Sequence, residues 1–332
     1  TEAADSTDEA AADDGEKAEV YVFIKNRGDL SYWDSMAEGG DRAATELADK
    51  ANIHVIETTA DLQANLTAMY EAADAGADLI ITASDFKDNL VEIANEYPDL
   101  ATVILNENVL DQAENGNMYG VDFSVSEASF LAGIAAGMKL NAMIEAGEFK
   151  PEEAKIGYVG AYPYAEVVSG YTAFFLGLQS IVPDVAMQVQ YTNSWFNITA
   201  ENEAAKALIA DGCIIVSQHA DSTGAPAACQ EALDAGTTVY CVGYNVDMLK
   251  VAPNAALTSP TNVWEVFYEY AFRAVMNGES FDQNWCQGYE ADAVTLTPLG
   301  ESCAPGTQEK VDETIAAIKA GSLHVFDTSK FT

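Results

Sequence analysis

The stretch Asp78-Leu79-Ile80-Ile81-Thr82, together with the segment that follows it, decides the fold. Its apolar run is almost continuous, which is typical of a strand covered on both faces in a parallel sheet. A helical pattern follows and ends before Pro98, and its apolar face is formed by Phe86, Leu90, Ile93 and Tyr97. A buried strand followed by an amphipathic helix is the repeating unit of an α/β protein.

The same unit recurs on both sides of this stretch. Apolar runs of strand type occur at 20–24, 54–56, 79–82, 102–105 and 119–123, and again at 156–159, 187–191, 213–217 and 239–242. Helical patterns lie between them, at 62–73, 127–143, 167–178, 201–210 and 225–235. Two successive series of this kind predict two doubly wound parallel sheets, joined by short crossover strands rather than by a Pro/Gly-rich linker.

Length and charge narrow the function. With 332 residues, the chain is long enough for about two domains. Its 53 acidic and 15 basic residues give a net charge of −38, which argues against nucleic acid and anionic membranes as partners, because phosphate-binding surfaces need clustered Lys or Arg. Hydrophobic residues make up 49% of the chain, so the acidity does not indicate disorder.

The first 19 residues are expected to form a disordered acidic tether, because they are mostly Ala, Asp and Glu and have no large apolar side chains. No signal peptide is visible. The five cysteines form no Cys-x-x-Cys pair, so a zinc site has no support. Cys286 and Cys303 are the preferred disulfide pair, and buried free thiols are the alternative for Cys213 and Cys241.

Aromatic and polar residues gather in the loops that follow the strands. In doubly wound sheets ligands bind beyond the carboxyl ends of the strands, so these loops are the expected binding site. Aromatic faces beside carboxylates and amides suit a flat, neutral ligand with hydrogen-bond donors, such as a base or nucleoside. Taken singly, a loop aromatic is more often packing, and a loop Asp is more often a turn or cap residue.

Motifs for catalysis are missing from the sequence. There is no Gly-x-Gly-x-x-Gly after the first strand, no Walker A sequence, no Gly-x-Ser-x-Gly and no His-x-x-x-His. The three histidines include His219, which lies near Asp221 without a nucleophile at motif spacing. We therefore expect no enzyme activity, no catalytic residue, no metal site and no cofactor.

Six motifs in the right order resemble the basic membrane lipoprotein family of ABC-transporter substrate-binding proteins, whose members are similar to purine-nucleoside receptors. The segments that carry this resemblance are Asp29–Ser35 with Gly39, Ser129–Gly133, Lys155–Gly160, Asn193–Phe196 with Gln218–Ser222, Gly243–Met248, and Leu257–Pro260. The resemblance runs from about Val20 to Thr332. Asn26 stands where the family has a leading Gly, and Trp33 stands where it usually has Asn.

The resemblance implies a periplasmic-binding-protein type 1 fold with two lobes and a hinge. Lobe 1 would comprise 20–124 plus 256–283, and lobe 2 would comprise 125–255 plus 284–332. The protein would be extracytoplasmic, tied to the membrane only by a lipid-anchored cysteine upstream of this numbering. Its partners would be a small-molecule ligand and ABC permease subunits. The two-sheet pattern itself predicts a monomer, because no exposed apolar helix face in the sequence demands a partner copy.

The ligand implied by the resemblance is a purine nucleoside or purine base. Tyr32 or Trp33 would form an aromatic sandwich with Trp195 or Phe196, and Asp247 would accept hydrogen bonds from ribose or base. The bulkier loop at 218–221 would favour a free base. The candidate ligand-binding residues are Tyr32, Trp33, Asp85, Phe123, Trp195, Phe196, His219, Asp221, Asn245 and Asp247.

Three other functions remain open from the sequence. Riboflavin is a competing ligand, because an aromatic sandwich also suits isoalloxazine. A signalling receptor of the same fold would be favoured by a fused kinase or DNA-binding segment, which the chain does not contain. A nucleoside hydrolase would need an acidic metal-binding cluster near the first strand, which is also missing.

Overall fold

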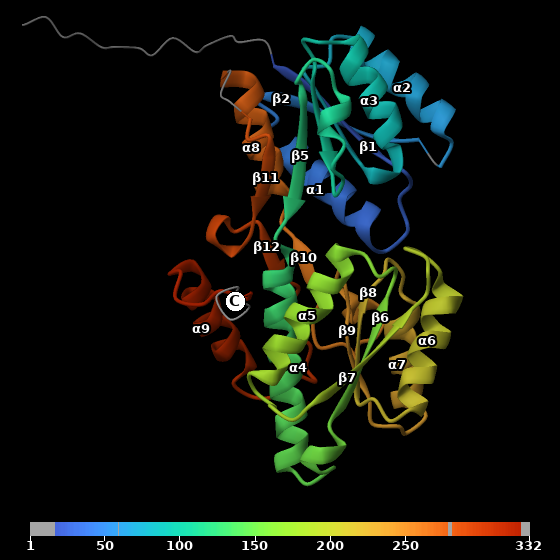
Figure 1. Ribbon diagram of the computed structural model, residues 1–332, viewed down its shortest axis with the longest axis vertical. Coiled ribbons are helices and arrows are strands. Elements are labelled where there is room, and N and C mark those ends of the chain that lie inside the picture. Colours follow the sequence, from blue (N-terminus) through green and yellow to red (C-terminus); the bar gives the residue numbers. More distant parts are fainter. Residues whose placement is uncertain (1–16, 59, 278–280, 327–332) are drawn as a thin grey trace, which may run out of the picture.

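The computed structural model describes residues 17–58, 60–277 and 281–326. Two parallel sheets form the centres of two lobes, one above the other in Figure 1. The first sheet contains, in spatial order, β2 (Ala51–Glu57), β1 (Ala18–Ile24), β3 (Leu79–Ala83), β4 (Ala101–Leu105), β5 (Met118–Phe123) and β11 (Asn284–Gln287). The second contains β7 (Ala186–Tyr191), β6 (Lys155–Gly160), β8 (Ile215–His219) and β9 (Tyr240–Val242). This confirms the predicted two-lobed, doubly wound α/β architecture.

Helices cover both sheets. Those of the first lobe are α1 (Tyr32–Glu46), α2 (Leu62–Asp74), α3 (Lys87–Glu96) and α8 (Trp264–Asn277). The remaining helices are α4 (Val125–Glu145), α5 (Ala165–Gln179), α6 (Ile198–Ala210), α7 (Gly224–Asp234) and α9 (Thr307–Lys319). In the part of the chain that the structure describes, no helix is both long enough and apolar enough to cross a lipid bilayer.

Strand order places a switch point in each sheet. In the first sheet β1 lies between β2 and β3, and in the second β6 lies between β7 and β8. The loops after β1 and β3, and those after β6 and β8, therefore diverge at the carboxyl edges of their sheets. Ligand crevices of doubly wound folds form at such points.

Short strands connect the lobes. β10 (Pro260–Asn262) and β12 (Val294–Leu296) form an antiparallel pair between the two sheets (Figure 1). A third connection runs from the end of β5 into α4. The segment 284–287 departs from the predicted boundary: we assigned it to lobe 2, but as β11 it pairs with β5 at the edge of the first sheet.

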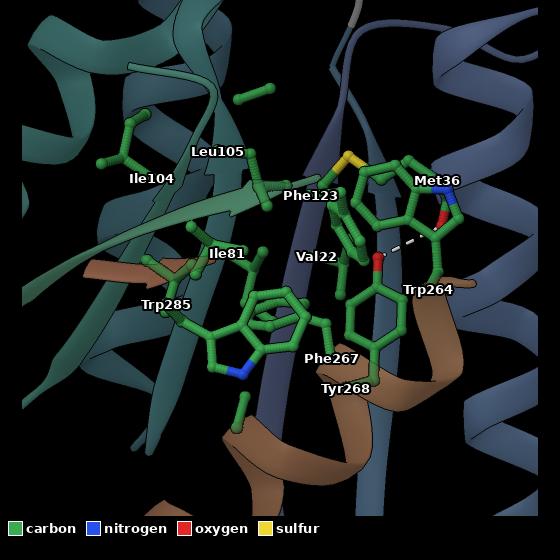
Figure 2. Packing of buried hydrophobic residues seen from close by; sticks show 14 of the residues in the cluster. Val22, Met36, Ile81, Ile104, Leu105, Phe123, Trp264, Phe267, Tyr268 and Trp285 are labelled. Carbon is green, nitrogen blue, oxygen red and sulfur yellow. Dashed lines mark hydrogen bonds between the residues drawn. The ribbon is translucent and has the colours of Figure 1, made fainter. Parts of the chain in front are cut away.

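The first-lobe core is built around aromatic residues of α8 (Figure 2). Trp264 is 1% exposed, and its indole N–H donates to the Ser35 hydroxyl at 2.8 Å. The Tyr268 hydroxyl donates to the Met36 carbonyl at 3.2 Å. A Cβ at Gly39 would come within 2.3 Å of the Trp264 side chain, so only glycine lets α1 and α8 approach this closely.

Reciprocal glycines join α4 to α5 in the second lobe. A Cβ at Gly133 would lie 2.0 Å from the Phe174 carbonyl oxygen, and one at Gly177 would lie 2.0 Å from the Phe130 carbonyl oxygen. The two helix backbones therefore touch, which any larger residue would prevent. This contact gives a physical reason for the glycine of the Phe-Leu-Ala-Gly motif.

The amino-terminal segment and the cysteines both differ from what the sequence predicted. Residues 1–16 of the predicted tether lie outside the described residues, while Ala18 and Glu19, also assigned to it, belong to β1. All five cysteines are free, so the predicted Cys286–Cys303 disulfide is wrong. Cys213 and Cys241 are buried free thiols, in agreement with the alternative that we kept open.

Candidate ligand-binding site

A cleft of about 1050 Å³ opens between the carboxyl edges of the two sheets. We call it the outer cleft; it is lined by Lys25, Asn26, Gly28, Asp29, Tyr32, Trp33, Ser84, Asp85, Asn106, Glu107, Tyr162, Tyr164, Ala165, Glu166, Ser194, Trp195, Phe196, Asp221 and Tyr244. Its walls are loops that follow the strands of both sheets, the switch-point loops among them. The volume is that of a site for a drug-sized ligand.

A smaller space of about 380 Å³, the inner chamber, adjoins the outer cleft. The inner chamber is lined by Tyr32, Asn106, Asp122, Phe123, Val125, Ser126, Ala165, Glu166, Ser169, Tyr244, Asn245 and Asn262. Both spaces share Tyr32, Asn106, Ala165, Glu166 and Tyr244. The combined site thus has a wide aromatic part and a narrow part close to the hinge.

The loop after β1 places the aromatic residues of the first lobe. Buried Asp29 accepts hydrogen bonds from the backbone N–H groups of Ser31, Trp33 and Asp34, each at 3.0 Å, and so caps the start of α1. Burial raises the pKa of the Asp29 carboxyl. Tyr32 and Trp33 follow directly, with their ring centroids 5.4 Å apart in an edge-to-face arrangement.

Aromatic residues of the second lobe face the same cleft. Tyr162 and Tyr164 stack with centroids 4.9 Å apart and an interplanar angle of 9°. Trp195 lies edge-on to Tyr162 at 5.7 Å. Phe196 is 46% exposed and Tyr164 is 54% exposed, so these large apolar faces are open to solvent or to a ligand.

Two loops of the second lobe are fixed to each other. The Asp221 backbone N–H donates to the Trp195 carbonyl at 2.6 Å. The fully buried Glu201 carboxylate accepts from the Asn197 N–H at 3.0 Å and from the Ser222 N–H at 3.2 Å. Burial raises the pKa of Glu201. The relative position of Trp195 and Asp221 is therefore set by buried hydrogen bonds.

A polar contact bridges the lobes at the floor of the cleft. Asn245 donates through Nδ2 to Asp221 Oδ1 at 2.8 Å and to the Ser31 hydroxyl at 3.2 Å. The Ser31 hydroxyl also lies 3.4 Å from Asp221 Oδ1. Ser31 belongs to the first lobe and the other two residues to the second, so separating the lobes must break this contact. We call it the interlobe bridge.

Left-handed backbone conformations gather in these loops. Within the described residues, five non-glycine residues have positive φ, and four of them lie in loops at the cleft: Leu30, Asn106, Asn193 and Asn245, at +52° to +64°. Asn tolerates this conformation better than most residues. Such strain is concentrated at functional sites.

The outer cleft contains two ion pairs. Lys25 Nζ lies 2.9 Å from Asp85 Oδ1, and Lys87 Nζ lies 2.9 Å from Glu107 Oε2. The Lys87 ammonium lowers the pKa of Glu107. Because each lysine already has a carboxylate partner, neither is left as a free anion-binding group.

Eight of the ten predicted residues line the outer cleft or the inner chamber: Tyr32, Trp33, Asp85, Phe123, Trp195, Phe196, Asp221 and Asn245. His219 does not line either space, because its side chain is 0% exposed. It lies behind the wall, against Tyr244 at a centroid distance of 4.1 Å.

Asp247 also differs from the prediction that it projects into the cleft. Its carboxylate accepts from the Leu249 N–H at 2.9 Å and caps a short 3-10 helix, Met248–Lys250. It lines a separate space of about 320 Å³ between α1 and the segment 245–251, bordered by residues of β10 and β12. Asp247 lines neither the outer cleft nor the inner chamber.

Four acidic residues that line the two spaces are absent from the predicted set: Asp29, Glu107, Asp122 and Glu166. Glu166 lines both spaces from the first turn of α5, and Asp122 lines the inner chamber from the end of β5. Glu166 could have been found from its position, because it lies where the loop after β6 enters α5, at the expected binding edge of the sheet. Within the described residues, no group of three or more His, Cys, Asp or Glu side chains is arranged to hold a metal ion.

Known proteins match this chain over nearly its whole length. A model of the family described as ABC transporter substrate-binding protein PnrA-like matches residues 17–319. The chain is 31% identical to a purine-binding protein of Brucella abortus over 318 residues, covering 95% of this chain and 85% of that protein. It is 30% identical to a Haloferax volcanii protein that carries the provisional name of ABC transporter glucose-binding protein, covering 96% and 76%.

Solved structures show the same fold. A solute-binding protein of an ABC transporter system from Aeropyrum pernix superposes with a TM-score of 0.75 at 20% identity, covering 93% of each chain. One from Conexibacter woesei has a TM-score of 0.70 at 19% identity, covering 94% of this chain and all of that one.

The matched family places this two-lobed chain among solute-binding proteins, not enzymes, and the solved structures share its fold. Within that class, the chain belongs to the PnrA-like family of ABC transporter substrate-binding proteins, as the sequence motifs predicted. It is thus the extracytoplasmic component that takes a small-molecule ligand to the permease subunits of an ABC transporter.

Proposed function

We propose that the protein captures a purine nucleoside or a purine base between its lobes. The observation that carries this proposal is that aromatic side chains of both lobes line one cleft: Tyr32 and Trp33 from the first lobe, and Trp195 and Phe196 from the second. A purine has two flat faces, and each stacking contact contributes about 1 kcal/mol beyond area burial.

Polar groups beside these rings match the edge of a purine. Asp221 offers carboxylate oxygens, and the amides of Asn106 and Asn26 offer both donors and acceptors. Hydrogen bonds to a charged acceptor contribute about 1.5–3 kcal/mol each. The name of the Brucella abortus relative supports a purine, while glucose, the sugar in the Haloferax volcanii name, and riboflavin are the competing ligands.

We further propose that the protein works as a monomer and is held at the membrane by a lipid attached upstream of residue 1. The family resemblance supports the lipid anchor. Analytical ultracentrifugation of the protein with and without ligand tests the monomer, and a stable dimer would contradict it. Mass spectrometry of the amino terminus of the full-length protein from its native membrane tests the lipid.

The ligand is tested in two steps. Mass spectrometry of small molecules released from the purified, heat-denatured protein identifies what the cleft captures in the cell. Calorimetric titration of the ligand-free protein then compares adenosine, guanosine, adenine, hypoxanthine, riboflavin and glucose. Saturable binding of a purine supports the proposal, and binding of glucose or riboflavin without any purine refutes it.

A pair of aromatic variants locates the binding in the cleft. Trp195→Ala removes a stacking face, and its affinity for the purine should fall at least about tenfold, the equivalent of 1.4 kcal/mol. Tyr191→Ala is the matched control, because Tyr191 lies on β7 in the same lobe, is 36% exposed and does not line the cleft. Equal losses in both variants would contradict the assignment.

A further inference from the structure

The carboxylates of the site fall into two groups that differ in their partners. Two carboxylates of the outer cleft, Asp85 and Glu107, each pair with a lysine at 2.9 Å. Asp122 and Glu166, which line the inner chamber, have no lysine or arginine ion pair among the described residues. In the part of the chain that the structure describes, the negative charge of Asp85 and Glu107 is thus offset by lysine, and that of Asp122 and Glu166 is not.

The uncompensated charge has visible effects on its surroundings. Desolvation raises the pKa of Asp122, and the charge of Glu166 adds to the increase. Burial raises the pKa of Asp221 well above its usual range, and Glu166 is again the next cause, followed by Asp29 and Glu201. The charge of Glu166 therefore acts on both of these carboxylates.

A buried imidazole, that of His219, lies behind Glu166. His219 is 0% exposed, and neither ring nitrogen has a hydrogen-bond partner among the described residues. Its Nε2 lies 3.7 Å from Glu166 Oε1. Gly170, one turn after Glu166 on α5, makes room for the ring, since a Cβ there would lie 2.5 Å from His219 Nδ1. Gly170 thus lets the imidazole ring pack close behind Glu166.

Aromatic rings complete the chamber. Tyr32, Phe123 and Tyr244 line it together with the two carboxylates. The face of an aromatic ring attracts a cation, more strongly when water is excluded. Carboxylates and aromatic faces around one small space therefore favour a positive group and disfavour a phosphate.

We propose that the inner chamber selects the charge of the ligand: it prefers a positively charged nitrogen group and rejects a phosphate, with Glu166 and Asp122 as the discriminating residues. The inference rests on the proposed function, because it places the flat ring in the aromatic outer cleft and the other end of the ligand in the chamber. It adds a charge preference that aromatic stacking alone does not require.

A charge series on one nucleoside tests the inference. Adenosine, 5′-amino-5′-deoxyadenosine and adenosine 5′-monophosphate share base and sugar but carry neutral, positive and negative groups at the same position. Calorimetry at fixed ionic strength should give the amino compound at least about tenfold tighter binding than adenosine, and the monophosphate at least about tenfold weaker binding.

Single-charge variants assign the effect to the chamber. Glu166→Gln and Asp122→Asn should each reduce the ratio of amino-compound to monophosphate affinity by about tenfold or more. Glu203→Gln is the matched control, because it removes one charge from an exposed position on α6 outside the cleft and should leave the ratio unchanged. Thermal melting of each ligand-free variant verifies that it is folded.

The outcomes separate the two proposals. Equal affinities across the series, tighter binding of the monophosphate, or a ratio that Glu166→Gln and Asp122→Asn leave unchanged would overturn the charge preference while keeping the purine site. If none of the three compounds binds, the proposed function is wrong, and the chamber is tested with tetramethylammonium instead. Saturable binding that Glu166→Gln abolishes then supports the charge preference, and no binding overturns it.

Discussion

Removing the hydroxyl of Ser31 should shift the protein toward an open form. In the structure this buried side chain takes part in the interlobe bridge, 3.2 Å from Asn245 Nδ2 and 3.4 Å from Asp221 Oδ1. Each hydrogen bond contributes about 0.5–1.5 kcal/mol. Because Asn245 keeps its 2.8 Å bond to Asp221 within the second lobe, Ser31→Ala costs the closed form about 1–2 kcal/mol and lowers the closed-to-open ratio about 5–30-fold.

Small-angle scattering of the ligand-free protein should then show a larger radius of gyration for Ser31→Ala than for the wild type. Ligand affinity should fall by up to the same factor, because the ligand must restore the closed form. Ser35→Ala is the matched control: its hydroxyl accepts from Trp264 inside the first lobe at 2.8 Å, so it should lower the melting temperature without opening the lobes. An unchanged radius and affinity in Ser31→Ala would refute the interlobe role of the bridge.

Four further results are expected. Asp247→Ala should leave ligand affinity within about twofold of wild type in calorimetry, since the carboxylate caps a helix outside the cleft. Asp221→Asn should gain stability relative to wild type as pH rises above about 4, because a raised folded-state pKa means that ionising Asp221 opposes folding; urea unfolding at about pH 4 and about pH 7 measures this. Gly177→Ala should destabilise by more than about 2 kcal/mol, because its Cβ meets the Phe130 carbonyl oxygen at 2.0 Å. With a net charge of −38, the unfolding midpoint should rise as KCl is added, and a midpoint independent of salt would contradict self-repulsion as a destabilising force.

The strands and helices of the sheets could be predicted because the apolar runs and helical periodicities that indicate them lie within short stretches of sequence. β3 and α3 follow the apolar run at 79–82 and the helical pattern that ends before Pro98, and both lie where the periodicity places them. β11 was not predictable in the same way. Its four residues, Asn284–Gln287, contain no apolar run, and the strand forms because β5 offers it a free edge. That edge exists only after the sheet has folded.

The cleft was predictable in part for a similar reason. Carboxyl ends of parallel strands meet at one edge, so Tyr32, Asp85, Trp195 and Asp221 could be brought together from strand positions alone. Which side of a loop a residue faces depends on packing in three dimensions. Asp247 follows β9 as the rule requires, yet the loop turns it past Asn245 to the far side of the interlobe bridge.

The sequence predicted that His219 would line the cleft and did not predict Glu166, whereas the structure buries His219 and places Glu166 at the cleft. The side chain of a residue at the end of β8 can turn away from the cleft where the neighbouring helix leaves space behind it. Gly170 leaves that space free, so the ring of His219 turns inward against Tyr244. Glu166, on the same face of α5 and one turn earlier, then occupies the cleft wall in its place. Gly170 therefore makes room for an imidazole behind the wall, while the carboxylate of Glu166 contributes to the wall itself.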